Sequence, residues 1–253
     1  DNTPTITSSA TASVAENGTA VMTVTATDAD LPAQTLSYSI VAGADAAKFS
    51  INASTGALSF VTAPDYEAPT DSGGNNVYDV TVQVSDGALT STQAIAVTVT
   101  PVNDNTPAIT SSATASVAEN STAVLTVTAT DADLPAQTLT YSIVGGADSA
   151  KFTINASTGA LSFVTAQNYE SPTDAGGNNV YDVTVQVSDG TLTSTQAIAV
   201  TVTPVNDNTP AITSSATASV AENTTAVMSV TATDADLPAQ TLSYSIVGGA
   251  DAA

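Results

Sequence analysis

Residues 77–84 read Val-Tyr-Asp-Val-Thr-Val-Gln-Val, and the same eight letters return at residues 180–187. Apolar and polar residues alternate along the stretch, which is the pattern of a β-strand with one face in a core and the other in water. Residues 95–100, Ile-Ala-Val-Thr-Val-Thr, repeat this alternation. The two stretches predict neighbouring strands and place the chain among the β-proteins.

Shorter alternating segments accompany them, and clusters of turn-forming residues lie between. These segments are residues 22–26, 36–40, 49–51 and 58–60. Six or seven short antiparallel strands in about 100 residues predict an all-β fold, a β-sandwich of immunoglobulin-like architecture with a core mainly of Val, Ile, Leu and Ala. We interpret Ser-Gly-Gly-Asn-Asn at 72–76 as a long hairpin turn that needs positive φ, and assign it no site.

The sequence repeats with a period of 103 residues. Residues 1–103 and 104–206 align without insertion or deletion and differ at twelve positions, and a third, partial copy covers 207–253. Such a period matches a whole small domain rather than a solenoid unit of about 20–50 residues. We therefore expect two complete domains and the N-terminal part of a third, and interpret the chain as part of a longer array.

Composition excludes several classes of function. The chain has no Cys and no His, which removes disulfides, thiolate zinc sites and His-dependent nucleophiles. The chain has 24 acidic residues and only two basic ones, Lys48 and Lys151, for a formal net charge of −22. Nucleic acid and anionic membranes would therefore be repelled, while cations would be attracted. No apolar run suits membrane insertion and no signal peptide is present, so any export signal or anchor is expected outside this chain.

Seventeen of the 24 acidic residues fall in short motifs that recur between copies. In the first copy they are Val-Ala-Glu-Asn at 14–17, Asp-Ala-Asp at 28–30, Asp-Tyr-Glu at 65–67 with Val-Ser-Asp-Gly at 84–87, and Val-Asn-Asp-Asn at 102–105. Carboxylate, amide and backbone oxygens suit Ca²⁺, which takes six to eight of them. The alternatives are a solubilising acidic surface and, for Asp65 with Glu67, glycoside hydrolysis, against which the absence of Trp counts.

The motifs occur in a fixed order, with Leu-x-Tyr-Ser-Ile, Phe-x-Ile and Ser-Thr-Gly between them, and the linker reads Pro-Val-Asn-Asp-Asn-Thr-Pro at 101–107 and 204–210. Over each full copy this set resembles the cadherin repeat, in the form found in tandem arrays of large bacterial calcium-dependent surface adhesins of the RTX type. The resemblance implies cadherin-type Greek-key sandwiches in an elongated array, with Ca²⁺ at the junction between successive repeats.

The resemblance also implies three sets of metal ligands. The first junction would use Glu16, Asp65, Glu67, Val102, Asn103, Asp104, Asn105, Asp131, Asp133 and Asp189, with a group near Gln137. The second would use Glu119, Glu170, Val205, Asn206, Asp207, Asn208, Asp234 and Asp236. A half-site before the first copy would use Asp1, Asn2, Asp28, Asp30 and Asp86.

Two departures from the family pattern affect these sets. Pro101 and Pro204 stand where the family keeps the first acid of the linker, and Asn168 replaces the Asp of the Asp-Tyr-Glu motif in the second copy. The second junction is therefore expected to bind calcium more weakly.

The sequence thus predicts a non-enzymatic, calcium-rigidified extension segment of a bacterial cell-surface adhesin, located outside the cell. Its expected partners are neighbouring repeats of the same polypeptide. Homophilic or filament contacts, and glycans bound through other domains, stay open. The alternative is an adhesive module whose repeats themselves recognise a partner copy or a glycan.

Overall fold

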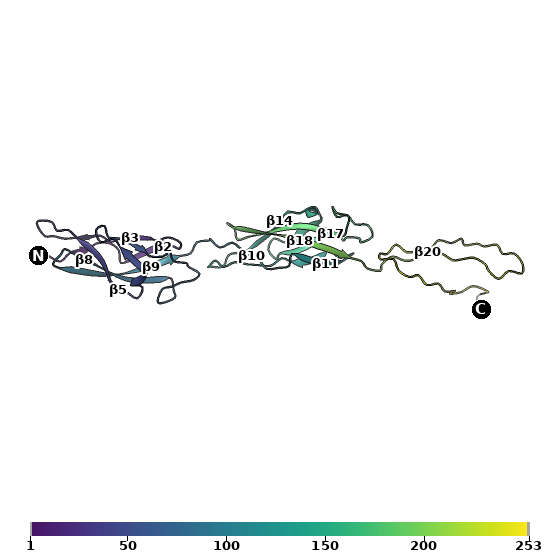
Figure 1. Ribbon diagram of the computed structural model, residues 1–253, viewed down its shortest axis with the longest axis horizontal. Coiled ribbons are helices and arrows are strands. Elements are labelled where there is room, and N and C mark those ends of the chain that lie inside the picture. Colours follow the sequence, from purple (N-terminus) through teal and green to yellow (C-terminus); the bar gives the residue numbers. More distant parts are fainter. Residues whose placement is uncertain (1, 252–253) are drawn as a thin grey trace. The chain divides into compact units, whose positions relative to one another are not determined.

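The computed structural model describes residues 2–251, and its regular structure is β-strand apart from two 3₁₀ turns (Figure 1). The first copy contains β1 (Thr5–Ile6), β2 (Thr11–Ala15), β3 (Ala20–Thr23), β4 (Ala26–Thr27), β5 (Ser37–Ala42), η1 (Ala46–Lys48), β6 (Phe49–Ile51), β7 (Ala57–Phe60), β8 (Val77–Ser85) and β9 (Thr90–Thr100). The second contains β10 (Ala108–Ile109), β11 (Thr114–Ala118), β12 (Ala123–Thr126), β13 (Ala129–Thr130), β14 (Thr140–Gly145), η2 (Ser149–Lys151), β15 (Phe152–Ile154), β16 (Ala160–Phe163), β17 (Val180–Ser188) and β18 (Thr193–Thr203). The third contains β19 (Ala211–Ile212) and β20 (Ala232–Thr233).

Each complete copy is a two-sheet sandwich. In the first copy a four-stranded sheet, β2-β9-β8-β5, faces a three-stranded sheet, β3-β7-β6, and β1 pairs with β4 beside them. The second copy repeats this order with β11-β18-β17-β14, β12-β16-β15 and the pair β10-β13. The prediction of an all-β sandwich is confirmed.

Contacts divide the chain into two compact units. The first unit is Asp1–Thr106 together with Asp131–Gln137, and the second is Pro107–Thr130 together with Thr138–Ala253. The loop 131–137 therefore belongs to the same unit as the first copy. None of the helices among the described residues is long and apolar enough to span a membrane.

The core follows from the alternation in β8. Tyr78, Val80, Val82 and Val84 point inward and are at most 1% exposed. Aromatic side chains contribute more than predicted, because the Phe60 ring stacks on a second phenylalanine and meets Tyr78 edge-on, with ring centroids 5.1 Å apart. Such edge-to-face pairs add about 0.5–1.5 kcal/mol to their area burial.

The strands differ from the prediction in two ways, one in pairing direction and one in the extent of a strand. β2 runs parallel to β9, in register from Thr11 opposite Ala96 to Ala15 opposite Thr100. Residues 22–26 do not form one strand, because the segment leaves β7 after Thr23 and continues as β4 beside β1. The chain crosses there from one sheet to another.

The loop 72–76 was expected to be a hairpin turn, and that expectation is wrong. It joins β7 to β8, which lie in different sheets, so no hairpin forms. Positive φ is nevertheless needed at Gly74 (63°) and Asn76 (60°).

Two buried carboxylates shape this loop from inside. Asp71 accepts backbone N–H groups of Gly73, Asn75 and Asn76 at 3.0–3.1 Å. Burial by itself raises the pKa of Asp71, but these donors outweigh it, and the pKa lies below its ordinary value. Asp45 binds the same region, and its two oxygens accept the N–H groups of Ser72 at 2.7 Å and Asp79 at 2.9 Å.

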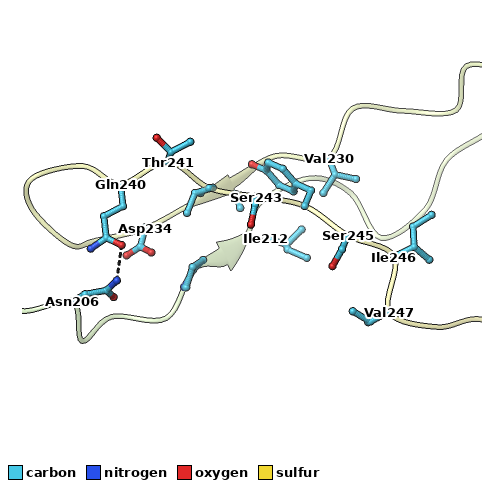
Figure 2. A pocket seen from close by; sticks show the side chains of 14 residues that line it. Asn206, Ile212, Val230, Asp234, Gln240, Thr241, Ser243, Ser245, Ile246 and Val247 are labelled. Carbon is cyan, nitrogen blue, oxygen red and sulfur yellow. Dashed lines mark hydrogen bonds between the residues drawn. The ribbon is translucent and has the colours of Figure 1, made fainter.

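The described part of the third copy leaves an apolar face uncovered (Figure 2). Ile212, Tyr244 and Ile246 are 71%, 55% and 83% exposed. In the first copy the corresponding residues, Ile6, Tyr38 and Ile40, pack against the core cluster built largely from β7, β8 and β9. The third copy has no counterpart of those strands among the described residues.

Removing the Asp45 carboxylate is expected to destabilise the first copy. Asp45→Ala leaves two backbone N–H groups without their acceptor, and a buried unsatisfied donor costs about 1–3 kcal/mol. We expect the free energy of unfolding, measured by urea denaturation, to fall by about 2–4 kcal/mol.

The second copy supplies the control, because position 46 corresponds to Ser149 there. Ala46→Ser is expected to change the free energy of unfolding by less than about 0.5 kcal/mol. An Asp45→Ala variant as stable as Ala46→Ser would show that the carboxylate does not hold the loop.

Candidate metal centre

Glu16 follows β2 and is the anchor of the first acidic cluster. Its side chain is 4% exposed. One oxygen accepts the backbone N–H of Val102 at 2.7 Å and the other that of Tyr66 at 2.7 Å. This single carboxylate therefore holds both the linker and the loop that follows β7 against the end of the sandwich.

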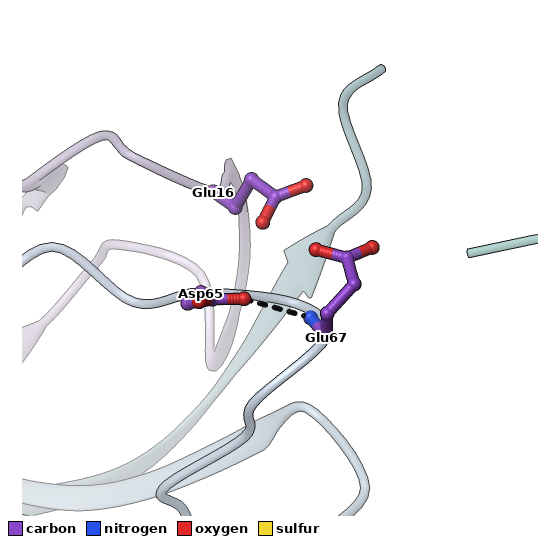
Figure 3. Close-up of side chains that lie close together, drawn as sticks. All are labelled: Glu16, Asp65 and Glu67. Atoms are coloured by element: carbon purple, nitrogen blue, oxygen red, sulfur yellow. Dashed lines mark hydrogen bonds between the residues drawn. The ribbon is translucent and has the colours of Figure 1, made fainter. Parts of the chain in front are cut away.

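Asp65 and Glu67 join Glu16 in this cluster (Figure 3). One carboxylate oxygen of each residue lies within 4.8 Å of the others. Asp65 also accepts the backbone N–H groups of Glu67 at 2.9 Å and Ala68 at 3.1 Å, which fixes the loop. Burial, with a smaller contribution from the Glu16 charge, raises the pKa of Glu67 above its ordinary value near 4.5.

A second cluster in the same unit consists of Glu67, Asp104 and Asp133, again with oxygens within 4.8 Å of one another. Asn105 holds it, because its side-chain amide donates to Asp104 at 3.0 Å and to Asp133 at 2.7 Å. The backbone N–H of Leu134 donates to Glu67 at 2.9 Å. Burial by itself raises the pKa of Asp133, but hydrogen bonds from Asn105 and others outweigh it and lower that pKa.

Three acids of the predicted half-site also lie together. Asp28, Asp30 and Asp86 bring oxygens within 4.8 Å of one another. The backbone N–H of Asn2 donates to both oxygens of Asp30, at 2.9 and 3.0 Å, and this bond is the main cause of a lowered pKa of Asp30. Asp1, which was assigned to the same set, lies outside the described residues.

The second unit repeats the arrangement with Glu119, Glu170 and Asp207, whose oxygens lie within 4.8 Å of one another. Glu119 accepts the N–H of Val205 at 2.6 Å, as Glu16 does that of Val102. Asn168 takes the structural part of Asp65, since its side-chain oxygen accepts the N–H of Ser171 at 2.8 Å. It brings no charge, so one carboxylate is missing from this cluster.

Two further acids of the second set lie beside the second linker. Asn208 donates through its side chain to Asp207 at 3.0 Å and to Asp236 at 2.7 Å. Asp234 accepts the backbone N–H of Asp236 at 3.1 Å. The side-chain amide of Asn206 donates to Gln240 at 2.6 Å.

The remaining predicted ligands are placed as follows. In the first unit Asp131 accepts the backbone N–H of Asp133 at 3.1 Å. In the second unit Asp189 accepts the N–H groups of Thr191 and Leu192, both at 2.7 Å. Ligand roles for Asn103 and for the carbonyls of Val102, Val205 and Asn105 stay predictions.

Six carboxylate oxygens among these residues are buried and have no hydrogen-bond partner. They belong to Asp28, Glu67, Asp86, Asp131, Glu170 and Asp236. A buried anionic oxygen without a donor is costly, and a cation removes that cost. Donor sets made only of carboxylate, amide and backbone oxygens suit Ca²⁺, so the residues present fit this ion.

Sequence reasoning missed the contribution of two asparagine side chains to these sites. Asn17 has φ of 61° and Asn120 has φ of 63°. Their side-chain amides donate to Asp104 and Asp207, respectively. The signal was the last letter of the Val-Ala-Glu-Asn motif, because asparagine tolerates left-handed backbone better than most residues.

Comparison with known proteins identifies the domain that each complete copy forms. The cadherin domain matches residues 10–100 and 113–203. Protocadherin Fat 1 of Homo sapiens is 34% identical over 205 residues, covering 76% of this chain and 4% of that protein. Protocadherin Fat 4 of Mus musculus is 33% identical over 247 residues, covering 90% and 5%. The chain thus spans a small fraction of these relatives.

Among solved structures, three repeats of mouse cadherin-23 (EC22-24) superpose with a TM-score of 0.69 at 26% identity, covering 93% of this chain and 79% of that one. The predicted cadherin-type sandwich is confirmed by this match. Cadherin repeats are extracellular modules of adhesion and structure. By the family match over both complete copies, the chain belongs to the cadherin family.

Proposed function

We propose that the chain is a calcium-rigidified extension segment of an extracellular adhesin, with Ca²⁺ bound by the acidic clusters that end the first and second copies. The observation that carries this proposal is the set of buried carboxylate oxygens without hydrogen-bond donors, among them those of Glu67 and Glu170. Their uncompensated negative charge favours the binding of a divalent cation by each cluster.

In this mechanism the ion adds cross-links between acidic segments that backbone and amide hydrogen bonds have already brought together. In the first unit Glu67 would share its two oxygens between the cluster with Glu16 and the cluster with Asp133. Like charges about 5 Å apart repel by roughly 3 kcal/mol at an effective dielectric of 20. Without the ion this repulsion loosens the linker. With the ion bound, the linker becomes a stiff joint.

The proposal places this segment on a bacterial cell surface, as the motif set indicated, although the relatives named above are animal proteins. Near-identical copies support a spacer role, since each unit then performs the same mechanical task. Finding the gene in an animal genome would contradict this placement without affecting the calcium mechanism.

Removal of calcium is expected to loosen the chain in solution. EDTA should give a more compact or more variable small-angle scattering profile than 2 mM CaCl₂, about the concentration that weak extracellular sites require. Mg²⁺ at the same concentration serves as the control, because its stricter octahedral geometry suits these clusters less well. An unchanged profile after chelation would count against the mechanism.

Exchange of one residue between copies tests the ligand assignment. Asp65→Asn places in the first cluster the side chain that Asn168 supplies in the second copy. This change is expected to weaken calcium binding by the first cluster about tenfold, or about 1.4 kcal/mol. Asn168→Asp should strengthen the second cluster by a similar factor. Both changes preserve the loop hydrogen bond, so calorimetric titration of the two variants reports on charge.

Equal calcium affinity in both variants and the parent chain would remove Asp65 from the ligand set. A thermal melt in EDTA controls for damage to the fold, because Asp65→Asn removes one repelling charge and is expected to melt at the same temperature as the parent chain or higher.

Calcium affinity is expected to fall in mild acid. The pKa of Glu67 is raised, chiefly by burial, so Glu67 takes up its proton at a higher pH than an ordinary glutamate. As the pH falls through the raised pKa of Glu67, protonation stabilises the calcium-free fold and competes with calcium binding. Titrations at pH 7 and about pH 5 should therefore show weaker binding and proton release at the lower pH. Identical affinities would contradict this role of Glu67.

A further inference from the structure

The first copy has a pocket beside its core, and Asp65 of the first metal cluster forms part of its wall. Its volume is about 420 Å³, and its lining includes Phe60, Tyr78, Thr62, Thr70 and Lys48. Phe60 and Tyr78 are 4% and 1% exposed, so the pocket reaches the aromatic part of the core. Small-molecule sites typically measure about 300–1,000 Å³.

The two copies differ at this place more than elsewhere. Three of their twelve differences fall within five positions, where Pro64, Asp65 and Ala68 correspond to Gln167, Asn168 and Ser171. The backbone is held alike in both copies. The carbonyl of Pro64 accepts the N–H of Asn17 at 2.9 Å, and that of Gln167 accepts the N–H of Asn120 at 3.0 Å.

In the second copy the Gln167 side chain is buried, with 5% exposure. Its amide nitrogen donates to the carbonyl of Thr165 at 2.6 Å, and its amide oxygen accepts the hydroxyl of Thr173 at 2.9 Å. Thr165 and Thr173 correspond to Thr62 and Thr70, which line the pocket of the first copy. The glutamine amide of the second copy therefore lies where the first copy is open.

Proline at position 64 has no amide to place there. In the first copy the Thr70 hydroxyl lies 3.5 Å from the Tyr78 hydroxyl, a longer contact than the 2.9 Å bond that Thr173 makes to Gln167. The Thr62 carbonyl and the Thr70 hydroxyl thus form an acceptor and a donor spaced for one carboxamide group. The second copy demonstrates that geometry with its own side chain.

We propose that the pocket of the first copy binds a small ligand through a carboxamide group. The ligand N–H would donate to the Thr62 carbonyl, and the ligand carbonyl would accept the Thr70 hydroxyl. Its methyl or methylene would lie toward Phe60, and Lys48 at the rim offers a donor to further oxygens. A primary amide and the acetamido group of an N-acetylated sugar both satisfy this pattern. The two hydrogen-bonding groups, the Thr62 carbonyl and the Thr70 hydroxyl, are not among the proposed calcium ligands, although Asp65 lines both sites.

The test uses the whole chain with calcium present, followed by ¹H–¹⁵N NMR. Propionamide and N-acetylglucosamine are the probes, and glucose, which lacks the acetamido group, is the control sugar. Both amides are expected to cause saturable shifts near Thr62 and Thr70 that glucose does not cause. Tighter binding of N-acetylglucosamine would assign the pocket to acetylated sugars, and tighter binding of propionamide to primary amides.

The two copies provide matched variants. Pro64→Gln introduces the side chain native to the second copy and should weaken probe binding at least tenfold. Gln167→Pro should create a second set of shifts near Thr165 and Thr173. Absence of saturable shifts in the parent chain, an equal response to glucose, or unchanged binding in Pro64→Gln would each overturn the proposal. Thermal melts check that both variants fold.

Discussion

The carboxylate of Glu16 is the interaction on which the acidic end of the first copy depends. Both of its oxygens accept backbone N–H groups, from the linker at Val102 and from the loop at Tyr66. A buried carboxylate with two such partners fixes the two segments relative to β2. The other acids gather because this bond places their segments together, so the fold creates the charge cluster before any ion enters.

That arrangement stores electrostatic repulsion in a chain with two cations and 24 acids. Backbone and amide donors relieve part of it, and Asn105 between Asp104 and Asp133 is the clearest case. Donors do not reach every oxygen, as Glu67 shows. Removing Asp65 or Glu67 would relieve repulsion in the calcium-free chain, and a bound cation would offset the same repulsion.

The sequence predicted the elements whose pattern is local. The alternation in residues 77–84 revealed β8, and the ordered acidic motifs revealed the clusters. It could not show that β2 pairs parallel with β9, because pairing direction depends on contacts 85 residues apart. Nor did it distinguish Asp45 and Asp71 from ordinary turn acids. Their function depends on N–H groups of a loop whose course is set by the crossing between two sheets.

The two complete copies allow two slightly different sequences to be compared on the same fold. Their strands and backbone hydrogen bonds correspond, so the twelve substitutions change chemistry while the scaffold stays the same. At positions 64 and 167 one scaffold accepts either a buried amide or an open pocket. Water can satisfy a polar pocket of this kind, so the open form needs no ligand to fold. The difference between the copies therefore lies in what each can bind, and a spacer built of near-identical units can still carry a recognition site in one of them.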